Sequence, residues 1–239
     1  MHPRIVLRRA QLPVRRYVTA RPTEAKPSNA ELELLDRALA RVDEFGWTQR
    51  AIGAAAADLG LSAMAAGVGG GGGGGARLVA HFMDRALDET CIEADDQLHE
   101  LEAPAERLRL LCRIRLRQTQ PHIRRWPEAA ALLARPENVP LAMRSLSDLA
   151  ARLWRLAGDC SVRADWYLRR SALAAAYLAS ELYMCEDRSP DLRCTWDFLD
   201  RRLASMHAAE DAANDATVIA GHFGRNLINI LASHGYVSR

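Results

Sequence analysis

Apolar side chains recur at steps of three and four residues along most of the chain, which is the spacing of amphipathic helices. The first such helix is expected to begin after Ser28, because Ser28 and Glu31 have the spacing of a capping box. Gly46 is expected to end it. The apolar face of this helix is formed by Leu32, Leu35, Leu39 and Val42.

Two further short helices are predicted next. Thr48 is placed to cap the second helix, Gly60 to turn the chain and Ser62 to cap the third. The second helix would bury Ile52, Ala55 and Leu59. Three short capped helices with a glycine turn are typical of a helix-turn-helix unit.

A larger helical body is predicted downstream of this unit. Residues 119–140 are expected to form short helices and turns, because prolines interrupt them at Pro121, Pro127, Pro136 and Pro140. No segment alternates as a strand does, so the fold class is predicted to be all-α, a helical bundle. Long helices are expected from Ala76 through the acidic segment CIEADDQLHELE, from Pro104 to about Gln118, from Leu141 to Leu156, from Asp165 to about Glu186, and from Pro190 to about Met206.

The segment LGLSAMAAGVGGGGGGGARLV interrupts the helix-turn-helix pattern. A base-reading helix needs side chains such as arginine, asparagine or glutamine, and this segment has none before Arg77. Each glycine in a helix costs about 1 kcal/mol relative to alanine. The third helix is therefore predicted to end near Val68, and Gly69–Gly75 to form a flexible surface loop of low complexity. This pattern argues against DNA reading.

Composition changes the picture at the N-terminus. The first twenty residues hold five arginines and no acid, a pattern typical of a mitochondrial transit peptide, with a plain basic tail as the alternative. Without them, 27 basic residues remain against 30 acidic ones, and the net charge falls from +2 to −3. The rest of the chain then has no general attraction for nucleic acid. No window of eighteen residues is wholly apolar, so no transmembrane helix is predicted.

The chain carries no motif of catalysis or of metal binding. Its five cysteines form no CxxC pair and are predicted to be separate thiols. The histidines are scattered, and HExxH, GxSxG, phosphate-loop and Glu-x-x-His patterns are absent from the sequence. We therefore expect no catalytic residue, no metal and no cofactor.

One charged side chain falls on an otherwise apolar helix stripe. The stripe is formed by Leu108, Leu111, Cys112, Arg115 and Thr119. A guanidinium at that position must extend to water, pair with an acid or hold an anionic headgroup. The sequence leaves these three alternatives open.

The segment GDCSVRADWYLRRSALAAAYLASELYMCED is the most distinctive in the chain. Trp166 and Tyr167 lie at a helix start and are followed by Arg169 and Arg170, a combination that suits an interface or a lipid headgroup region. Because Arg170 lies four residues after Trp166, the two share a helix face, and the guanidinium is placed to hold a phosphate by two parallel hydrogen bonds. The apolar arc beyond them predicts a cavity wall for a lipid tail, with plain core packing as the alternative. Its members are Leu173, Ala175, Ala176, Tyr177 and Met184.

The C-terminal segment from Asp211 to His234 is a separate amphipathic stretch. It is predicted to lie in the plane of a membrane interface with its apolar face among the headgroups. Packing on the helical body or on a second subunit is the alternative. The apolar stripe is formed by Ile219, Phe223, Leu227, Ile230 and Leu231.

The chain resembles the lipid-binding proteins of mitochondrial ubiquinone biosynthesis. Two segments carry the resemblance: RLRQTQPHIRRWPEAAALLARPENVP and LWRLAGDCSVRADWYLRRSALAAAYLASELYMCEDRSPDLRCTWDFLDRRL. The resemblance runs from about Glu31 to the C-terminus. It implies a tetracycline-repressor-like fold and a homodimeric, non-enzymatic protein held peripherally on the matrix side of the inner membrane. Such proteins bind isoprenoid quinone intermediates and phospholipid in a hydrophobic pocket and present demethoxyubiquinone to a di-iron hydroxylase. No nucleic acid partner is implied.

The resemblance also implies roles for particular residues. The surface that meets the hydroxylase would contain Trp166 and Tyr167, with Asp159 and Arg169 beside them. The C-terminal stripe would engage the membrane. The lipid would contact Arg170, Leu173, Ala176, Tyr177, Met184 and Arg115. The family usually has an acid three residues before the tryptophan, where this chain has Arg163, so the charge of the partner surface is expected to differ there.

The predicted organisation has five parts. They are a transit peptide over 1–20, a linker over 21–28, a helix-turn-helix-like unit with a glycine-rich loop over 29–75, a lipid-binding bundle over 76–208, and a membrane-associating helix over 209–239. Two alternatives from other function classes stay open. One is a ligand-responsive transcription regulator of the tetracycline-repressor type, and the other is an unrecognised oxidoreductase.

Overall fold

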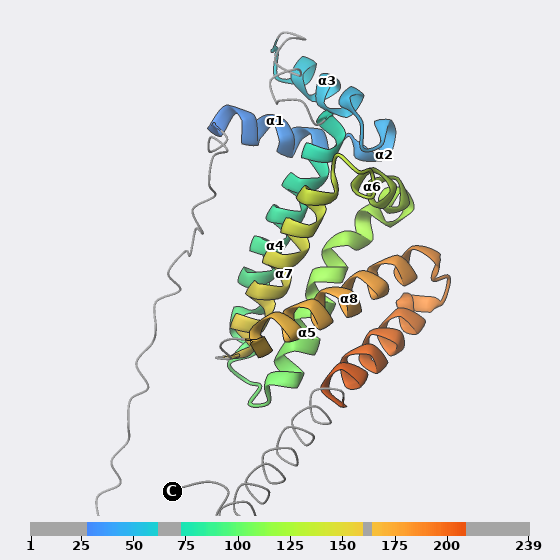
Figure 1. Cartoon of the computed structure of the whole chain (residues 1–239). Coiled ribbons are helices and arrows are strands. Elements are labelled where there is room, and N and C mark those ends of the chain that lie inside the picture. Colours follow the sequence, from blue (N-terminus) through green and yellow to red (C-terminus); the bar gives the residue numbers. More distant parts are fainter. Residues whose placement is uncertain (1–27, 62–72, 160–163, 209–239) are drawn as a thin grey trace, which may run out of the picture.

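The computed structural model describes residues 28–61, 73–159 and 164–208, with side chains of the last range from Tyr167 onward. All regular elements in these ranges are helices, as predicted (Figure 1). The transit peptide, the linker up to residue 27, the third helix of the helix-turn-helix unit and the C-terminal stripe lie outside the described residues. The helices are α1 (Asn29–Leu39), α2 (Val42–Phe45), α3 (Gln49–Asp58), α4 (Gly74–Leu98), α5 (Pro104–Thr119), η2 (Gln120–Arg125), α6 (Trp126–Leu133), α7 (Val139–Ala157), α8 (Ala164–Glu186), η3 (Pro190–Leu192) and a helix over 193–208.

Side-chain caps fix where the N-terminal helices begin. The Ser28 hydroxyl accepts a hydrogen bond from the main-chain N–H of Glu31 at 3.2 Å, and the Thr48 hydroxyl accepts one from Arg50 at 3.2 Å. Both caps match the sequence expectation. The single helix predicted from Ser28 to Gly46 is instead divided, because α1 ends at Leu39 and α2 begins at Val42. Gly46 ends α2 with a φ of 68°, in the left-handed region that glycine adopts without strain.

α4 belongs to both halves of the molecule (Figure 1). Its first turns pack against α1 and α3, and it also packs along α5 and α7. Its 25 residues span about 37 Å. The N-terminal unit and the helical body therefore pack on one continuous helix.

The glycine run does not end as predicted. The expected loop reached Gly75, but α4 begins at Gly74, so the last two glycines are helical. Gly75 is buried, and a Cβ atom there would overlap the main-chain carbonyl oxygen of Trp47. At this position the absence of a side chain permits close packing of α4 against the N-terminal unit.

We expect Gly75→Ala to destabilise the protein by about 1–3 kcal/mol, because the overlap with Trp47 outweighs the gain in helix propensity. Gly53→Ala is the matched control. Gly53 is also helical, in α3, and a Cβ atom added there would have no neighbouring atom within 4 Å. This control should be neutral or raise the stability by up to about 1 kcal/mol. Thermal melting of both variants measures the difference, and a Gly75→Ala protein as stable as the control would contradict the packing described.

Four rings join the N-terminal unit to the body. Trp47, Phe82, His122 and Trp126 meet edge to face with ring centroids 5.2–5.6 Å apart. The indole N–H of Trp47 donates to the carbonyl oxygen of Arg125 at 3.0 Å. Because these residues come from the turn before α3, from α4, from η2 and from α6, they hold four segments together.

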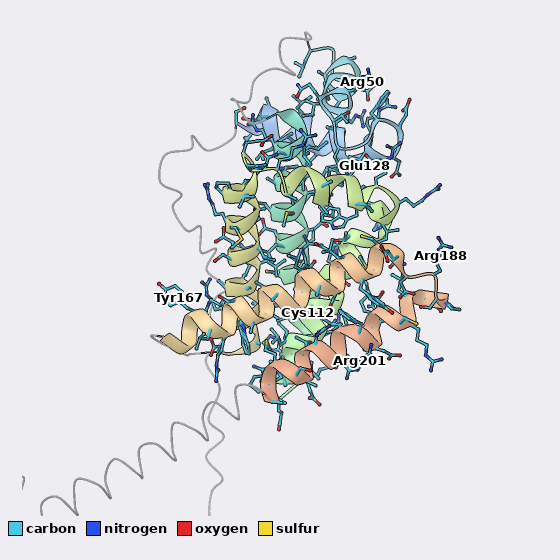
Figure 2. The ribbon with its side chains drawn as sticks, turned by 45° about the vertical axis from the view of Figure 1, so that its right-hand side comes forward. Arg50, Cys112, Glu128, Tyr167, Arg188 and Arg201 are labelled. Carbon is cyan, nitrogen blue, oxygen red and sulfur yellow. The ribbon has the colours of Figure 1, made fainter. Side chains whose placement is uncertain are left out.

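The rest of the core lies between α4, α5, α7, α8 and the helix over 193–208. Figure 2 shows α8 and the helix over 193–208 side by side across the body. The turn between them is held by Asp187, whose carboxylate accepts hydrogen bonds from Ser189 and Thr195. Although burial raises the pKa of Asp187, these hydrogen bonds lower it to about 2. Central members of this core are Leu108, Leu111, Leu149, Leu153, Leu173 and Leu199.

Candidate functional site

The two faces of α8 differ in their surroundings. The inner face packs on α6, α7 and η2, and its Tyr177 and Glu181 side chains contact α5. It buries five residues that were predicted from the sequence to contact lipid, together with Glu181. The five are Arg170, Leu173, Ala176, Tyr177 and Met184. The outer face holds large exposed apolar side chains: Tyr167, Leu168, Leu178, Leu182 and Tyr183.

A polar centre is buried under the inner face. Arg115 of α5 is fully buried, and its Nη1 donates to the Thr119 hydroxyl at 3.0 Å. That hydroxyl donates to Glu181 Oε1 at 3.4 Å, and the Tyr177 hydroxyl donates to the same oxygen at 3.1 Å. The Arg115 guanidinium carbon lies 5.6 Å from the centroid of the Phe82 ring and 5.9 Å from that of the Tyr177 ring. We call Arg115, Thr119, Tyr177 and Glu181 the buried polar centre.

Burial controls the ionisation of this centre. It raises the pKa of Glu181, while the Arg115 charge and hydrogen bonds from Tyr177, Trp126 and Thr119 oppose that rise. Burial also raises the pKa of Tyr177 well above its ordinary value, so the phenol is a donor at neutral pH. The nearby thiol of Cys112 is fully buried, which raises its pKa to about 12. The thiol is therefore not a nucleophile at neutral pH.

A second charged group lies at the N-terminal end of α8. Arg169 Nη1 lies 3.2 Å from Asp159 Oδ1, and Arg170 Nη1 lies 3.7 Å from Asp159 Oδ2. The Asp159 side chain is only 3% exposed and lies close to both arginine side chains. Burial lowers the pKa of Arg170, Asp159 opposes this, and Arg155 adds to it. Arg170 lies seven residues before Tyr177, about 10 Å along the helix axis.

The predicted lipid-binding residues thus fall into two groups. Arg115 and Tyr177 meet at the buried polar centre, whereas Arg170 belongs with Asp159 at the end of α8. Ala175, expected within the inner apolar arc, is exposed on the outer face. The stripe Ile219, Phe223, Leu227, Ile230 and Leu231 and the side chain of Trp166 lie outside the described residues.

Tyr167 and Leu168 form the exposed end of α8. Each is 69% exposed, and Figure 2 shows Tyr167 at the end of the helix far from Arg188. Beside them Arg169 lies over the Trp154 ring, with its guanidinium carbon 5.7 Å from the ring centroid, and its carbonyl oxygen accepts from the Trp154 indole at 3.0 Å. An exposed aromatic next to an anchored arginine is a common composition for a protein interface.

The sequence pattern did not indicate a role for Glu181, and it placed Thr119 only on the apolar stripe of α5. A local signal existed for each, because Thr119 lies four residues after Arg115 and Glu181 four residues after Tyr177. The contact between α5 and α8, which brings the Arg115–Thr119 pair to the Tyr177–Glu181 pair, cannot be predicted from a local pattern.

Metal clusters and membrane-spanning helices are absent from the described part of the chain. In residues 28–61, 73–159 and 164–208, no three or more His, Cys, Asp or Glu side chains gather as a metal site. The thiols described there, Cys91, Cys112, Cys185 and Cys194, are unpaired with one another. None of the helices in these ranges is long and apolar enough to cross a bilayer.

The arrangement of helices is that of the tetracycline-repressor class. The crystal structure of the TetR transcriptional regulator from Nitrosomonas europaea matches 73% of this chain and 96% of its own with a TM-score of 0.56, at 20% identity. That likeness establishes the fold. The sequence identifies the family. The COQ9 family pattern matches residues 139–215, and full-length relatives match a larger part of this chain. The chain belongs to the COQ9 family.

Two relatives show how far the match extends. Ubiquinone biosynthesis protein COQ9-B, mitochondrial, of Xenopus laevis is 35% identical over 201 residues, covering 79% of this chain and 68% of the relative. The protein named COQ9, mitochondrial, of Homo sapiens is 35% identical over 199 residues, covering 79% of this chain and 62% of the relative. The chain spans about three fifths of the length of most of the curated relatives it matches.

Proposed function

We propose that this protein is a non-catalytic, lipid-binding accessory protein of ubiquinone biosynthesis. It binds isoprenoid quinone intermediates and phospholipid within the helical body and presents demethoxyubiquinone to the di-iron hydroxylase. The observation that carries the proposal is the division of α8 into an inner face with a polar centre among apolar side chains and an outer face with exposed aromatics. The names of the relatives, which are ubiquinone biosynthesis proteins, support the pathway.

The same proposal includes where the protein works. The relatives are named mitochondrial, which supports a mitochondrial site, and we place the protein peripherally on the matrix side of the inner membrane. Residues 1–20 would direct import, and the C-terminal stripe would contact the membrane. The protein is proposed to be a homodimer without a nucleic acid partner.

Lipid extraction tests the proposal directly. Mass spectrometry of lipid that co-purifies with the full chain is expected to find isoprenoid quinone intermediates or phospholipid well above protein-free background. Addition of the protein to the hydroxylase should accelerate hydroxylation of membrane-embedded demethoxyubiquinone, while the protein alone turns over no quinone. Background lipid only, or turnover without the hydroxylase, would refute the proposal.

A transcription regulator remains the alternative function, favoured by the fold alone. It predicts sequence-dependent DNA binding at physiological salt in an electrophoretic shift. Binding of that kind would displace the lipid-presentation proposal.

Arg170 is expected to hold the headgroup of bound phospholipid. Arg170→Lys should lose part of the co-purifying phospholipid and Arg170→Ala more, because lysine keeps the charge without the two parallel donors. Arg152→Ala is the control, since Arg152 pairs with Asp88 of α4 and not with Asp159.

The competing role of Arg170 is an ion pair with Asp159, because Arg170 Nη1 lies 3.7 Å from Asp159 Oδ2. If the ion pair is its whole role, Arg170→Ala lowers the melting temperature and leaves the phospholipid content of the folded protein unchanged. Phospholipid content and melting temperature, measured on the same samples, separate the two roles.

A further inference from the structure

Two donors of Arg115 have no acceptor within the described part of the chain. The side chain is fully buried, yet neither Nε nor Nη2 has a hydrogen-bond partner there. These two nitrogens form one edge of the planar guanidinium, with their N–H bonds nearly parallel. A buried donor without an acceptor is costly, so a whole unsatisfied edge marks a place where a ligand oxygen is favoured.

The rest of the guanidinium is occupied. Nη1 donates to Thr119, which connects it to Glu181, and the Phe82 and Tyr177 rings lie against the group. The positive charge of Arg115 thus has a negative counterpart within the centre. A second buried negative charge would lie close to Glu181 and would be opposed by it.

We propose that the free edge of Arg115 binds two neighbouring, uncharged oxygen atoms on a flat ring, namely a ring carbonyl and the methoxyl group beside it. This inference rests on the proposed function and specifies its ligand: the buried polar centre recognises the oxygenated head of a quinone. The aromatic rings of Phe82 and Tyr177, which lie against the guanidinium, suit such a flat ring. Phospholipid is left to Arg170 at the end of α8.

Calorimetric titration of the delipidated full chain tests this with two probes. One is 2,3-dimethoxy-5-methyl-1,4-benzoquinone carrying one isoprene unit. The other is its trimethyl analogue, in which both methoxyls are methyl groups. The wild-type chain is expected to bind the dimethoxy probe at least about tenfold more tightly, because only that probe supplies the adjacent oxygen pair to a charged donor.

Two variants connect the preference to the guanidinium edge. Arg115→Lys keeps the charge and loses the edge, so the preference should fall to about one while the circular dichroism spectrum stays that of the wild type. Arg113→Lys is the matched control on the same helix. Arg113 pairs with Asp200 at 2.8 Å outside the centre, and this variant should keep the preference.

Three results would overturn the assignment. They are equal affinity of the wild-type chain for the two quinones, an unchanged preference in a folded Arg115→Lys protein, or Arg115-dependent binding of decanoate or a short phosphatidylglycerol in place of the dimethoxy probe. If Arg115→Lys does not fold, the wild-type comparison decides by itself. Failure of the proposed function is a separate result, in which no quinone binds and no isoprenoid lipid is recovered.

Discussion

Glu181→Leu is expected to lower the free energy of unfolding by about 3–5 kcal/mol, the range observed when a buried charge is left without its counter-charge. The loss is large because Arg115, fully buried, would keep its charge without the carboxylate that faces it through Thr119. The double variant Arg115→Leu with Glu181→Leu should recover much of this loss, since both charges leave and apolar volume remains. Urea unfolding of the single and double variants measures the coupling.

Arg115→Leu by itself should show a pH dependence that Glu181→Leu lacks. Burial raises the pKa of Glu181 and Arg115 opposes the rise, so removal of Arg115 raises that pKa further. A group whose pKa is raised on folding contributes stability below its unfolded pKa and loses that contribution as pH rises through the folded pKa. Arg115→Leu should therefore be less destabilised near pH 4 than near pH 8. A flat profile would show that Glu181 is not controlled by Arg115.

Tyr167→Ala is expected to weaken binding of the di-iron hydroxylase by about thirtyfold, which corresponds to about 2 kcal/mol and is typical of an aromatic hot spot. Tyr167 is 69% exposed at the end of α8, so its ring contributes little to the core. The change should leave the melting temperature within about 1 °C of the wild type, since surface substitutions rarely alter stability by more than about 0.5 kcal/mol. Binding is measured by surface plasmon resonance with the full chain.

Tyr183→Ala is the control for this surface. Tyr183 is another exposed tyrosine of α8, 40% exposed and stacked on Phe198 at 4.5 Å, but it lies sixteen residues from Tyr167. We expect hydroxylase binding to be retained in this variant. Equal loss of binding in both variants would place the hydroxylase along the whole outer face, and a sharp fall in melting temperature for Tyr167→Ala would make that residue part of the core.

Local patterns predicted the helices well because helix starts and ends are fixed by nearby residues. The caps at Ser28 and Thr48 and the stop at Gly46 each depend on atoms within four residues. Gly75 was misplaced because its requirement is not local: the atom that excludes a side chain there belongs to Trp47, 28 residues earlier.

The candidate site was predictable only in part. The stripe on α5 singled out Arg115, and the arc on α8 singled out Tyr177, but their contact depends on how two helices pack. The inner and outer faces of α8 were not separable from sequence, because alanine and leucine occur on both sides of the helix, as Ala175 and Ala176 illustrate. Glu181 was overlooked because an acid among exposed leucines and tyrosines resembles a solvated position.

The shared rings give the N-terminal unit a use that does not involve DNA. Trp47 closes one side of the ring cluster, and Phe82 within that cluster also lies against Arg115 of the buried polar centre. Deleting the chain before Gly74 would expose Phe82 and Trp126 to water. The Phe82 ring that packs against the Arg115 guanidinium would then be solvated. The unit is thus an integral cover for the buried polar centre, and this structural role explains its place in the fold without any contact with DNA.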